Sequence, residues 1–350
     1  MAVGAKNAPS GALAEIPSAI GHLSSVPRFA GLVIPVMGRD MPNQDTVHPV
    51  LTGLGFRSGS RVAIFHADDV GMCHGANAAF RELSRLGSIS CGAVMVPCPW
   101  FAEVAEMAAA ERSLDLGVHL TLTSEWTSYR WGPISTTSRS SGLFDEGGYF
   151  WRRLPMLASH VVPEAAELEM RAQIEKALAS GIDVTHLDTH MGAALLPQLI
   201  GIYVRLGREY KLPILLPKQI LEYTSVLDFA GISLDGYLET LAGLEADGWP
   251  LVDHFRMTPG VPSAESDRTY RDLVAGLPPG LTMVALHPNT SGDIEAIVPA
   301  KAHFRTDEYR LLTDQEFRRF MSRQGIETIG FRALRDLLRR RLGELQFNRI

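Results

Sequence analysis

The sequence is poor in cysteine and has no long hydrophobic run, and these absences exclude several classes of protein. Only Cys73, Cys91 and Cys98 occur among 350 residues, and none has a C-x-x-C spacing. Neither a disulfide framework nor a thiolate zinc site is therefore expected, and a cytoplasmic location is the default. The apolar run at residues 29–37 is too short to span a bilayer, and no basic segment leads directly into it. We expect no integral membrane segment.

Positive charge is also scarce, and phosphate-binding glycine motifs are missing. The 33 Lys and Arg residues are outnumbered by 39 Asp and Glu residues, which gives a formal net charge of -6. Because no overall basic field attracts a phosphate backbone, nucleic acid is not an expected partner. No G-x-G-x-x-G or G-x-x-x-x-G-K-[ST] segment opens a helix, which removes the main reason to expect a nucleotide-binding open sheet.

The composition is that of a soluble globular protein, with 46% hydrophobic and 21% charged residues. The length allows two average domains, but an α/β barrel commonly uses about 250 residues or more around one core. Residues 1–44 are rich in Ala, Gly, Ser and Pro and lack a sustained period, so we predict an N-terminal extension that can be flexible. The predicted catalytic domain covers residues 45–340, and residues 341–350 are expected to form a C-terminal tail.

Short apolar runs alternate with helical patterns from Arg61 to the C-terminus. The predicted strands are residues 61–67, 89–96, 115–123, 184–190, 212–216, 281–287 and 326–330. The predicted helices are residues 75–86, 101–111, 164–179, 196–210 and 266–276, and the arginine-rich residues 331–341 predict a further helix with a solvated basic face. Such alternation indicates a parallel sheet, either barrel or doubly wound, and the missing nucleotide motifs favour a barrel.

Two predicted strands carry ionisable side chains on one face only. His119 lies opposite a row of leucines and a valine, and His186, Asp188 and His190 share one face of the strand that follows. Because the chemistry of a parallel barrel collects at the carboxyl ends of its strands, these groups are predicted to face the barrel mouth. A buried polar group without a partner costs roughly 2–7 kcal/mol, so they must bind one another, a metal or a substrate.

An aspartate pair directly follows the first predicted strand. Asp68 and Asp69 come after residues 61–67, and Gly71 follows closely. Adjacent residues of a regular strand face opposite sides, but a chain that turns at the strand end can bring both carboxylates into one site. The alternative is a helix N-cap, since the next helix starts near Gly75. One cap does not account for two carboxylates that close an apolar strand.

Residues 124–150 are mostly Ser, Thr, Gly and aromatic residues and show no helical period. A stretch of this kind is typical of a long functional loop over a barrel mouth. Trp126 and Trp131 lie inside it, and flat rings beside polar groups suit the faces of sugars. The alternative is that these aromatic side chains only pack the loop against the domain.

Four motifs in order resemble the signatures of the YdjC/ChbG family of carbohydrate deacetylases. They are HADDVG at 66–71, LGVHLTLT at 116–123, THLDTH at 185–190 and ALHP at 285–288. The resemblance covers about residues 50–335, and four ordered motifs are more specific than any single one. Val70 replaces a frequent aromatic residue of the family, and Met191 and Gly192 stand where many relatives have further histidines. These departures leave the identity of the substrate open.

The resemblance implies a distorted, TIM-like (β/α) barrel with a single catalytic domain and one divalent metal ion, Zn²⁺ or Mg²⁺. Carried onto this sequence, it makes Asp69, His119 and His190 the metal ligands and Asp68 the general base. It makes His287 the general acid or an oxyanion stabiliser; the alternative for this residue is an ordinary turn histidine before a proline.

Three further residues are candidates for supporting these groups. Asp188 shares a face with His190 and can orient a ligand imidazole as a hydrogen-bond acceptor. His186 shares that face as well, and His66 precedes the aspartate pair, so both are expected in or behind the pocket.

A bound divalent cation polarises an acetamide carbonyl and lowers the pKa of its bound water from about 15.7 toward about 7 in favourable zinc sites. The predicted activity is removal of the acetyl group from an N-acetylated amino sugar, oligosaccharide or glycoconjugate, which gives acetate and a free amine. The alternatives are a metal-dependent amidase or esterase for a non-sugar substrate, and a non-catalytic carbohydrate-binding protein. A carboxylate left unligated at Asp68 argues against the latter. A homo-oligomer is compatible with the sequence.

Overall fold

The computed structural model describes residues 48–219 and 233–347. The predicted extension over residues 1–44 lies outside the described residues and stays a prediction. The following account concerns the domain that contains the described residues.

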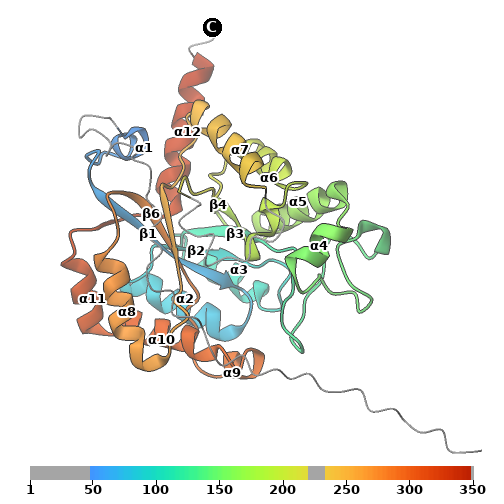
Figure 1. The fold of residues 1–350 in the computed structure, drawn as a ribbon, viewed down its shortest axis with the longest axis horizontal. Coiled ribbons are helices and arrows are strands. Elements are labelled where there is room, and N and C mark those ends of the chain that lie inside the picture. Colours follow the sequence, from blue (N-terminus) through green and yellow to red (C-terminus); the bar gives the residue numbers. More distant parts are fainter. Residues whose placement is uncertain (1–47, 220–232, 348–350) are drawn as a thin grey trace, which may run out of the picture. The chain divides into compact units, whose positions relative to one another are not determined.

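Seven strands of the described chain form one parallel sheet (Figure 1). They are β1 (Arg61–Val70), β2 (Cys91–Val94), β3 (Leu116–Leu120), β4 (Val184–Thr189), β5 (His254–Met257), β6 (Gly280–Leu286) and β7 (Glu327–Thr328). The order is β4-β3-β2-β1-β6-β5, and β7 pairs with the first half of β1. All pairs are parallel, which confirms the predicted α/β class.

Two elements differ from the predicted strands. No regular strand forms at residues 212–216, where Ile214 makes only an isolated bridge to Leu187. The other difference is β5, which is not among the predicted strands, because four residues are too few for an alternation to stand out from its surroundings.

The irregular segment between β4 and β5 closes the sheet into a ring. Leu187 of β4 accepts a hydrogen bond from the N–H of Leu215 and donates its own N–H to the carbonyl of Pro213, at 3.0 and 2.9 Å. Further along, Lys218 donates its N–H to the carbonyl of Val252, just before β5, at 3.0 Å. The ring of hydrogen bonds is therefore a distorted barrel, as predicted. One position in the barrel wall is occupied by the irregular segment between β4 and β5 instead of a regular strand.

Helices surround the strands on the outside (Figure 1). They are α1 (Pro49–Gly53), α2 (His74–Leu86), α3 (Phe101–Ala110), α4 (Leu154–His160), α5 (Pro163–Ala179), α6 (Ile200–Tyr210), α7 (Leu234–Ala246), α8 (Ser263–Ala275), α9 (Asp293–Ile297), α10 (Ala302–Thr313), α11 (Gln315–Ser322) and α12 (Phe331–Phe347), with short 3-10 turns η1 (Arg139–Ser141) and η2 (His190–Leu195). The predicted helices correspond to α2, α3, α5, α6, α8 and α12.

Helix α2, which follows the aspartate pair, shows how local sequence sets these elements. Ala76, Phe80 and Leu83 recur at helical spacing and are buried against the sheet. Gly87 ends the helix with a φ of 69°, and its N–H bonds the carbonyls of Leu83 and Ser84. Burying a side chain such as Phe80 stabilises the fold by about 1.5–3 kcal/mol. The helix therefore packs firmly behind the strand that carries Asp68 and Asp69.

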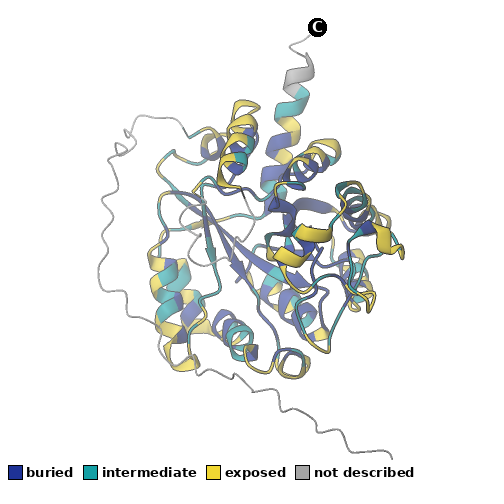
Figure 2. Ribbon diagram, turned by 45° about the vertical axis from the view of Figure 1, so that its right-hand side comes forward, coloured by how far each residue is buried: buried dark blue, intermediate teal, exposed yellow. Residues whose placement is uncertain are grey.

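The core of the described domain is continuous. Every residue of β2, β3 and β6 is buried, as expected for strands covered on both sides, and Figure 2 shows these strands in dark blue inside partly exposed helices. One hydrophobic cluster extends from Leu51 near the start of the described chain to Leu338 near its end. A single domain accounts for this core. No helix among the described residues has the length and apolar character needed to cross a membrane.

Helix α12 differs from its predicted form in extent and in surroundings. It runs to Phe347, beyond the predicted helix over residues 331–341. Its basic face is only partly solvated, because Arg335 is buried and pairs with Asp183 at 2.6 Å. Arg332 pairs with the same carboxylate. The helix thus fastens to the amino-terminal end of β4 rather than presenting all its arginines to water.

Candidate active site

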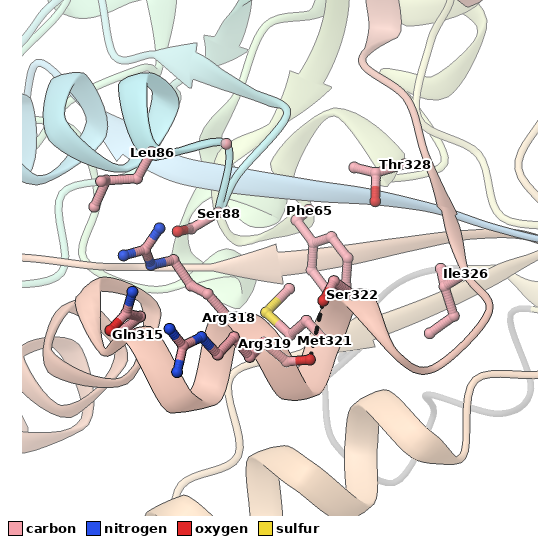
Figure 3. Close-up of a pocket in the computed structure, with 11 residues that line it drawn as sticks. Phe65, Leu86, Ser88, Gln315, Arg318, Arg319, Met321, Ser322, Ile326 and Thr328 are labelled. Carbon is pink, nitrogen blue, oxygen red and sulfur yellow. Dashed lines mark hydrogen bonds between the residues drawn. The ribbon is translucent and has the colours of Figure 1, made fainter.

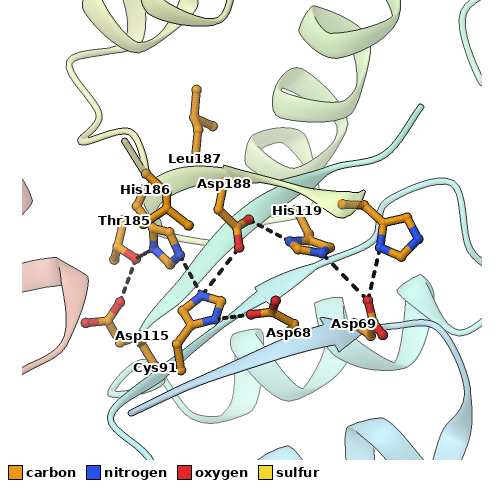
Figure 4. A network of polar contacts seen from close by, with 12 residues as sticks. Asp68, Asp69, Cys91, Asp115, His119, Thr185, His186, Leu187 and Asp188 are labelled. Carbon is orange, nitrogen blue, oxygen red and sulfur yellow. Dashed lines mark hydrogen bonds and ion pairs between the residues drawn. The ribbon is translucent and has the colours of Figure 1, made fainter. Parts of the chain in front are cut away.

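The aspartate pair lies on a bulge in β1. The strand continues through Asp68 and Asp69 to Val70, but its register with β2 shifts between Ala67 and Val70. Asp69 has a φ of 60°, in the left-handed region that few residues other than Gly, Asn and Asp adopt. A bulge re-aims side chains, and both carboxylates here face one group of histidines (Figure 4). Neither aspartate caps α2, whose N-cap residue is Cys73.

Asp69, His119 and His190 converge on one point. Asp69 Oδ1 lies 3.6 Å from His119 Nε2 and 3.2 Å from His190 Nδ1. All three residues are buried, and their facing atoms lie within 4.8 Å of one another. Asp69 Oδ1 has no hydrogen-bond partner within residues 48–219 and 233–347. The structure therefore brings together the three residues that the family resemblance implied as a metal-ligand set.

A carboxylate holds the outer nitrogen of each histidine in this set. Asp188 Oδ1 lies 2.8 Å from His119 Nδ1, and Glu125 Oε2 lies 2.9 Å from His190 Nε2. Burial opposes a charge on either ring, but Asp188 outweighs it and raises the pKa of His119. Glu125 and Asp69 likewise raise the pKa of His190 to about 10. The remaining nitrogens are left to face the centre of the set.

Trp131 packs beside His190. The ring centroids are 6.1 Å apart in an edge-to-face arrangement, and the indole N–H donates to the carbonyl of Thr123 at 2.8 Å. The ring is buried, so it contacts the histidine rather than open space. Trp126 is half-buried and packs against the core, and its indole nitrogen has no partner in the described chain.

Arg305 of α10 approaches Asp69 from the other side. Its Nη1 lies 2.8 Å from Asp69 Oδ2, which leaves Oδ1 for the two histidines. Burial alone would raise the pKa of Asp69, but Arg305 and His190 hold that pKa well below its usual range. No sequence motif pointed to this arginine, because 236 residues separate the partners and only the fold joins them.

Asp68 is beside this set but has other partners. Its Oδ1 lies 2.6 Å from His66 Nδ1, and its Oδ2 lies 3.7 Å from His287 Nε2. The side chains of Asp68 and His287 are 12% and 19% exposed, so water can reach the space between them. The predicted base and acid thus lie next to each other, and both border the predicted ligand set.

Three residues behind His287 hold its ring and backbone. Thr258 Oγ1 lies 2.7 Å from His287 Nδ1, and the His287 N–H donates to Glu308. Tyr270 donates its hydroxyl to the same carboxylate. Burial raises the pKa of Glu308 to about 7, and burial with the nearby Arg305 lowers the pKa of His287. Sequence reasoning missed these residues, since Thr258 directly follows β5 and the other two lie on α8 and α10, and none of these segments carries a motif.

A buried chain of polar contacts leads from Asp115 through Thr185 to His186 (Figure 4), and His66 joins this chain to Asp68. His66 Nε2 lies 2.8 Å from His186 Nε2, and His186 Nδ1 lies 3.0 Å from Thr185 Oγ1. Thr185 Oγ1 lies 2.6 Å from Asp115 Oδ1. Gly117 of β3 makes room for this chain, since a Cβ there would lie 2.4 Å from the His186 ring.

A separate surface cavity lies outside the barrel (Figure 3). Its volume is about 400 Å³, and it is lined by Phe65, Leu86, Ser88 and residues of α11 that include Arg318 and Arg319. Phe65 and His66 are neighbours in β1 and point to opposite faces of the strand. The cavity therefore contains none of the predicted site residues.

Independently of the sequence motifs, the ligand atoms of Asp69, His119 and His190 are suited to a divalent cation. A buried carboxylate oxygen without a hydrogen bond is costly, and Asp69 Oδ1 is such an atom. Two imidazoles and one carboxylate are ligands that Zn²⁺ and neighbouring transition metals accept. A second cluster, formed by His66, His186 and Asp188, has a similar composition. Its two histidine Nε2 atoms lie 2.8 Å apart and engage each other, and only the carboxylate of Asp188 lacks a hydrogen-bond partner among the described residues.

Comparisons with known proteins agree with the motifs. Residues 62–323 match the model of the family described as YdjC-like protein. A carbohydrate deacetylase of Thermus thermophilus is 35% identical over 289 residues, which is 82% of this chain and 97% of that protein. A carbohydrate deacetylase of Brevibacillus brevis is 28% identical over 276 residues, covering 77% of this chain and 98% of that protein.

A solved structure shares the fold. The crystal structure of an Enterococcus faecalis protein, described as a candidate cellobiose-phosphate cleavage protein, superposes with a TM-score of 0.63 at 24% identity. The likeness covers 79% of this chain and 99% of that chain.

Proposed function

The chain belongs to the YdjC-like protein family, and from this membership and the site we propose that it is a metal-dependent carbohydrate N-deacetylase. The reaction is hydrolysis of the acetamide of an N-acetylated amino sugar, oligosaccharide or glycoconjugate to acetate and a free amine. The observation that carries the proposal is the convergence of Asp69 Oδ1, His119 Nε2 and His190 Nδ1 beside the partly exposed carboxylate of Asp68.

Asp69, His119 and His190 would hold one divalent ion, with Zn²⁺ or Mg²⁺ as the first candidates. When bound, such an ion supplies Lewis acidity toward the acetyl carbonyl and toward water. The chain's own contribution is to fix its ligands. Arg305 occupies the second oxygen of Asp69, while Asp188 and Glu125 orient the two imidazoles.

Asp68 is the proposed general base. His66 engages one of its oxygens, and the other oxygen faces the space next to His287. A carboxylate in this position accepts the proton of a water molecule that attacks the acetyl carbon. His287, the proposed general acid, donates a proton to the departing amine, or a hydrogen bond to the developing oxyanion.

The aromatic residues receive different roles. Trp131 is proposed to support His190, because its ring is buried against that histidine. Trp126 is half-buried in the loop after β3, and we propose it as a contact for a sugar ring. His186 is proposed to act from behind Asp68, through His66. A cytoplasmic location and a homo-oligomeric state remain predictions.

The test is acetate release from N-acetylglucosamine oligomers by the purified full chain, with and without a chelator, alongside Asp68→Asn. We expect release by the wild type, and loss of release both with chelator and in the variant. General bases contribute roughly 10²–10⁴-fold, so the variant should lose activity by that factor while binding the metal as before.

Two results would redirect the proposal. Equal activity in Asp68→Asn would remove the assigned base. Release of acid from non-sugar amides or esters, with none from amino sugars, would keep the metal site and change the substrate class.

A further inference from the structure

The buried chain of side chains behind Asp68 contains more hydrogen-bond contacts than its groups have hydrogens to donate. Four contacts join Asp115 to Thr185, Thr185 to His186, His186 to His66, and His66 to Asp68, at 2.6, 3.0, 2.8 and 2.6 Å. Each contact needs one hydrogen. A hydroxyl and two neutral imidazoles supply three, and two ionised carboxylates supply none. The chain must therefore carry one additional proton, or two acceptors would face each other in the barrel interior.

The surroundings of Asp115 suit that proton. Its Oδ2 accepts the backbone N–H of Arg332 at 2.8 Å, and its Oδ1 faces the Thr185 hydroxyl. A carboxylic acid fits this arrangement, with its carbonyl oxygen toward the N–H and its O–H toward Thr185. The guanidinium of Arg332 bonds Asp183 and a backbone carbonyl rather than Asp115.

The charged and titratable neighbours of Asp115 are consistent with this assignment. Burial is the largest influence and raises its pKa, whereas the Thr185 and Arg332 contacts oppose the rise. Cys91, which also faces the carboxyl group, is buried, and its own pKa lies well above the usual value. Burial lowers the pKa of His186 well below its ordinary value, so that ring is neutral.

We propose that Asp115 carries the additional proton at neutral pH and thereby sets the direction of every hydrogen bond in the chain. Asp115 donates to Thr185, which donates to His186 Nδ1. His186 then donates from Nε2 to His66 Nε2. His66 donates from Nδ1 to Asp68 Oδ1.

The direction of the chain matters at its far end. Because His66 is a donor, Asp68 Oδ1 is an acceptor, and Oδ2 is left facing His287. Asp115, Thr185, His186 and His66 are then positioning residues. Their effect on turnover rests on the proposed function, in which Asp68 is the base, whereas the proton pattern itself does not.

The proposal predicts different activities for the variants Asp115→Asn and Asp115→Leu. In Asp115→Asn the amide N–H₂ donates to Thr185 and the amide oxygen accepts from Arg332, so the polarity of a protonated acid is kept. We expect Asp115→Asn to retain kcat within about threefold, and Asp115→Leu to lose roughly 10–100-fold, the range typical of groups that orient active-site residues. If Asp115→Asn is as impaired as Asp115→Leu, the carboxylate is ionised and the proposal is wrong.

Thr185 provides a second pair of variants with smaller changes in packing. Thr185→Val removes the hydroxyl that joins Asp115 to His186, and Thr185→Ser keeps it. We expect Thr185→Val to reduce kcat about tenfold or more, with metal content and KM unchanged, and Thr185→Ser to restore it. Equal kcat in the two variants would overturn the proposal, since a purely structural hydroxyl would alter stability alone.

Nitrogen NMR of the histidine rings tests the proton pattern without any activity assay. In the metal-loaded full chain, His186 should carry its proton on Nε2 and His66 should carry one on Nδ1. A proton on His186 Nδ1 would contradict the proposal even if the enzyme is active. If the wild type releases no acetate, the proposed function fails, while the NMR pattern still decides the state of Asp115.

Discussion

Two clusters of histidine and aspartate lie on the same strands, yet they differ in what their atoms contact. Asp69, His119 and His190 form one, and His66 and His186, with Asp188 beside them, form the other. In the first, the outer nitrogens are held by carboxylates, and the inner nitrogens face Asp69 Oδ1 at 3.6 and 3.2 Å. In the second, the two imidazoles bond each other. The same residue types therefore form the proposed ion site in one place and a hydrogen-bonded chain in the other, according to the partners of their outer atoms.

The largest difference between the two regions is expected when an aspartate in each is replaced by asparagine. Asp69→Asn removes the charge of the converging carboxylate, and Asn still tolerates the left-handed backbone at that position. Loss of one preorganised stabilising group costs roughly 10²–10³ in kcat, so we expect at least that loss, together with loss of bound metal. Metal analysis and acetate release check this. Asp115→Asn is the matched control, and equal losses in both variants would erase the distinction between the regions.

Removing the cationic partner of Asp69 should have the next largest effect. Arg305→Met leaves a buried carboxylate unpaired, which typically costs about 3–5 kcal/mol, and the slight exposure of Arg305 places this case near 3 kcal/mol. We expect this fall in the free energy of unfolding without metal, and partial recovery on adding Zn²⁺, as followed by urea denaturation.

The control lies on the same helix. Arg310→Met removes an exposed arginine that pairs with Asp307, and it should change stability by less than about 1 kcal/mol. No recovery with metal in Arg305→Met would mean that the ion and the arginine do not share Asp69.

Asp253 lies outside both clusters and is expected to affect the stability of the fold but not the activity. Burial opposes ionisation of Asp253, but the His48 hydrogen bond and Lys218 lower its pKa to about 2. A carboxylate whose pKa is lowered in the folded state stabilises the fold at pH values above its unfolded pKa of about 3.9. This contribution is lost as the pH falls from about 4 to about 2. Asp253→Asn should cost about 2 kcal/mol at pH 7 and almost nothing near pH 2, with kcat unchanged. A pH-independent difference would contradict this assignment.

The smallest effect is expected where an aromatic ring supports a histidine. Trp131→Phe keeps a ring beside His190 but loses the hydrogen bond to the Thr123 carbonyl. We expect a loss of about 1 kcal/mol in stability and a modest fall in metal affinity, measured by unfolding and metal titration. An unchanged metal affinity would restrict this tryptophan to packing the loop.

The comparison also explains what the sequence could and could not predict. His119, Asp188 and His190 were predictable as neighbours, because side-chain alternation within a strand is local and parallel strands end at one edge. The assignment of Asp69 and Asp68 to different roles came from the family motifs, since adjacent aspartates alone leave their directions open. The bulge that separates the two aspartates is a property of strand pairing.

Residues that hold the site from helices were beyond sequence reasoning. Arg305, Glu308 and Tyr270 lie on α10 and α8, and their partners are tens to hundreds of residues away. Their positions follow from how the helices pack around the barrel, which no local period encodes. The irregular segment that closes the ring was predicted as a strand for a related reason, since its apolar pattern reports burial rather than regular pairing.

The absence of a side chain at Gly117 allows the chain of contacts behind Asp68 to form. Because position 117 has no side chain, the imidazole of His186 fits directly against the backbone there. Even alanine would displace His186 and separate His66 from Thr185, so position 117 affects how Asp68 is held although it does not take part in the chain of contacts. A substitution at this depth would therefore impair the proposed base without changing any residue that contacts it.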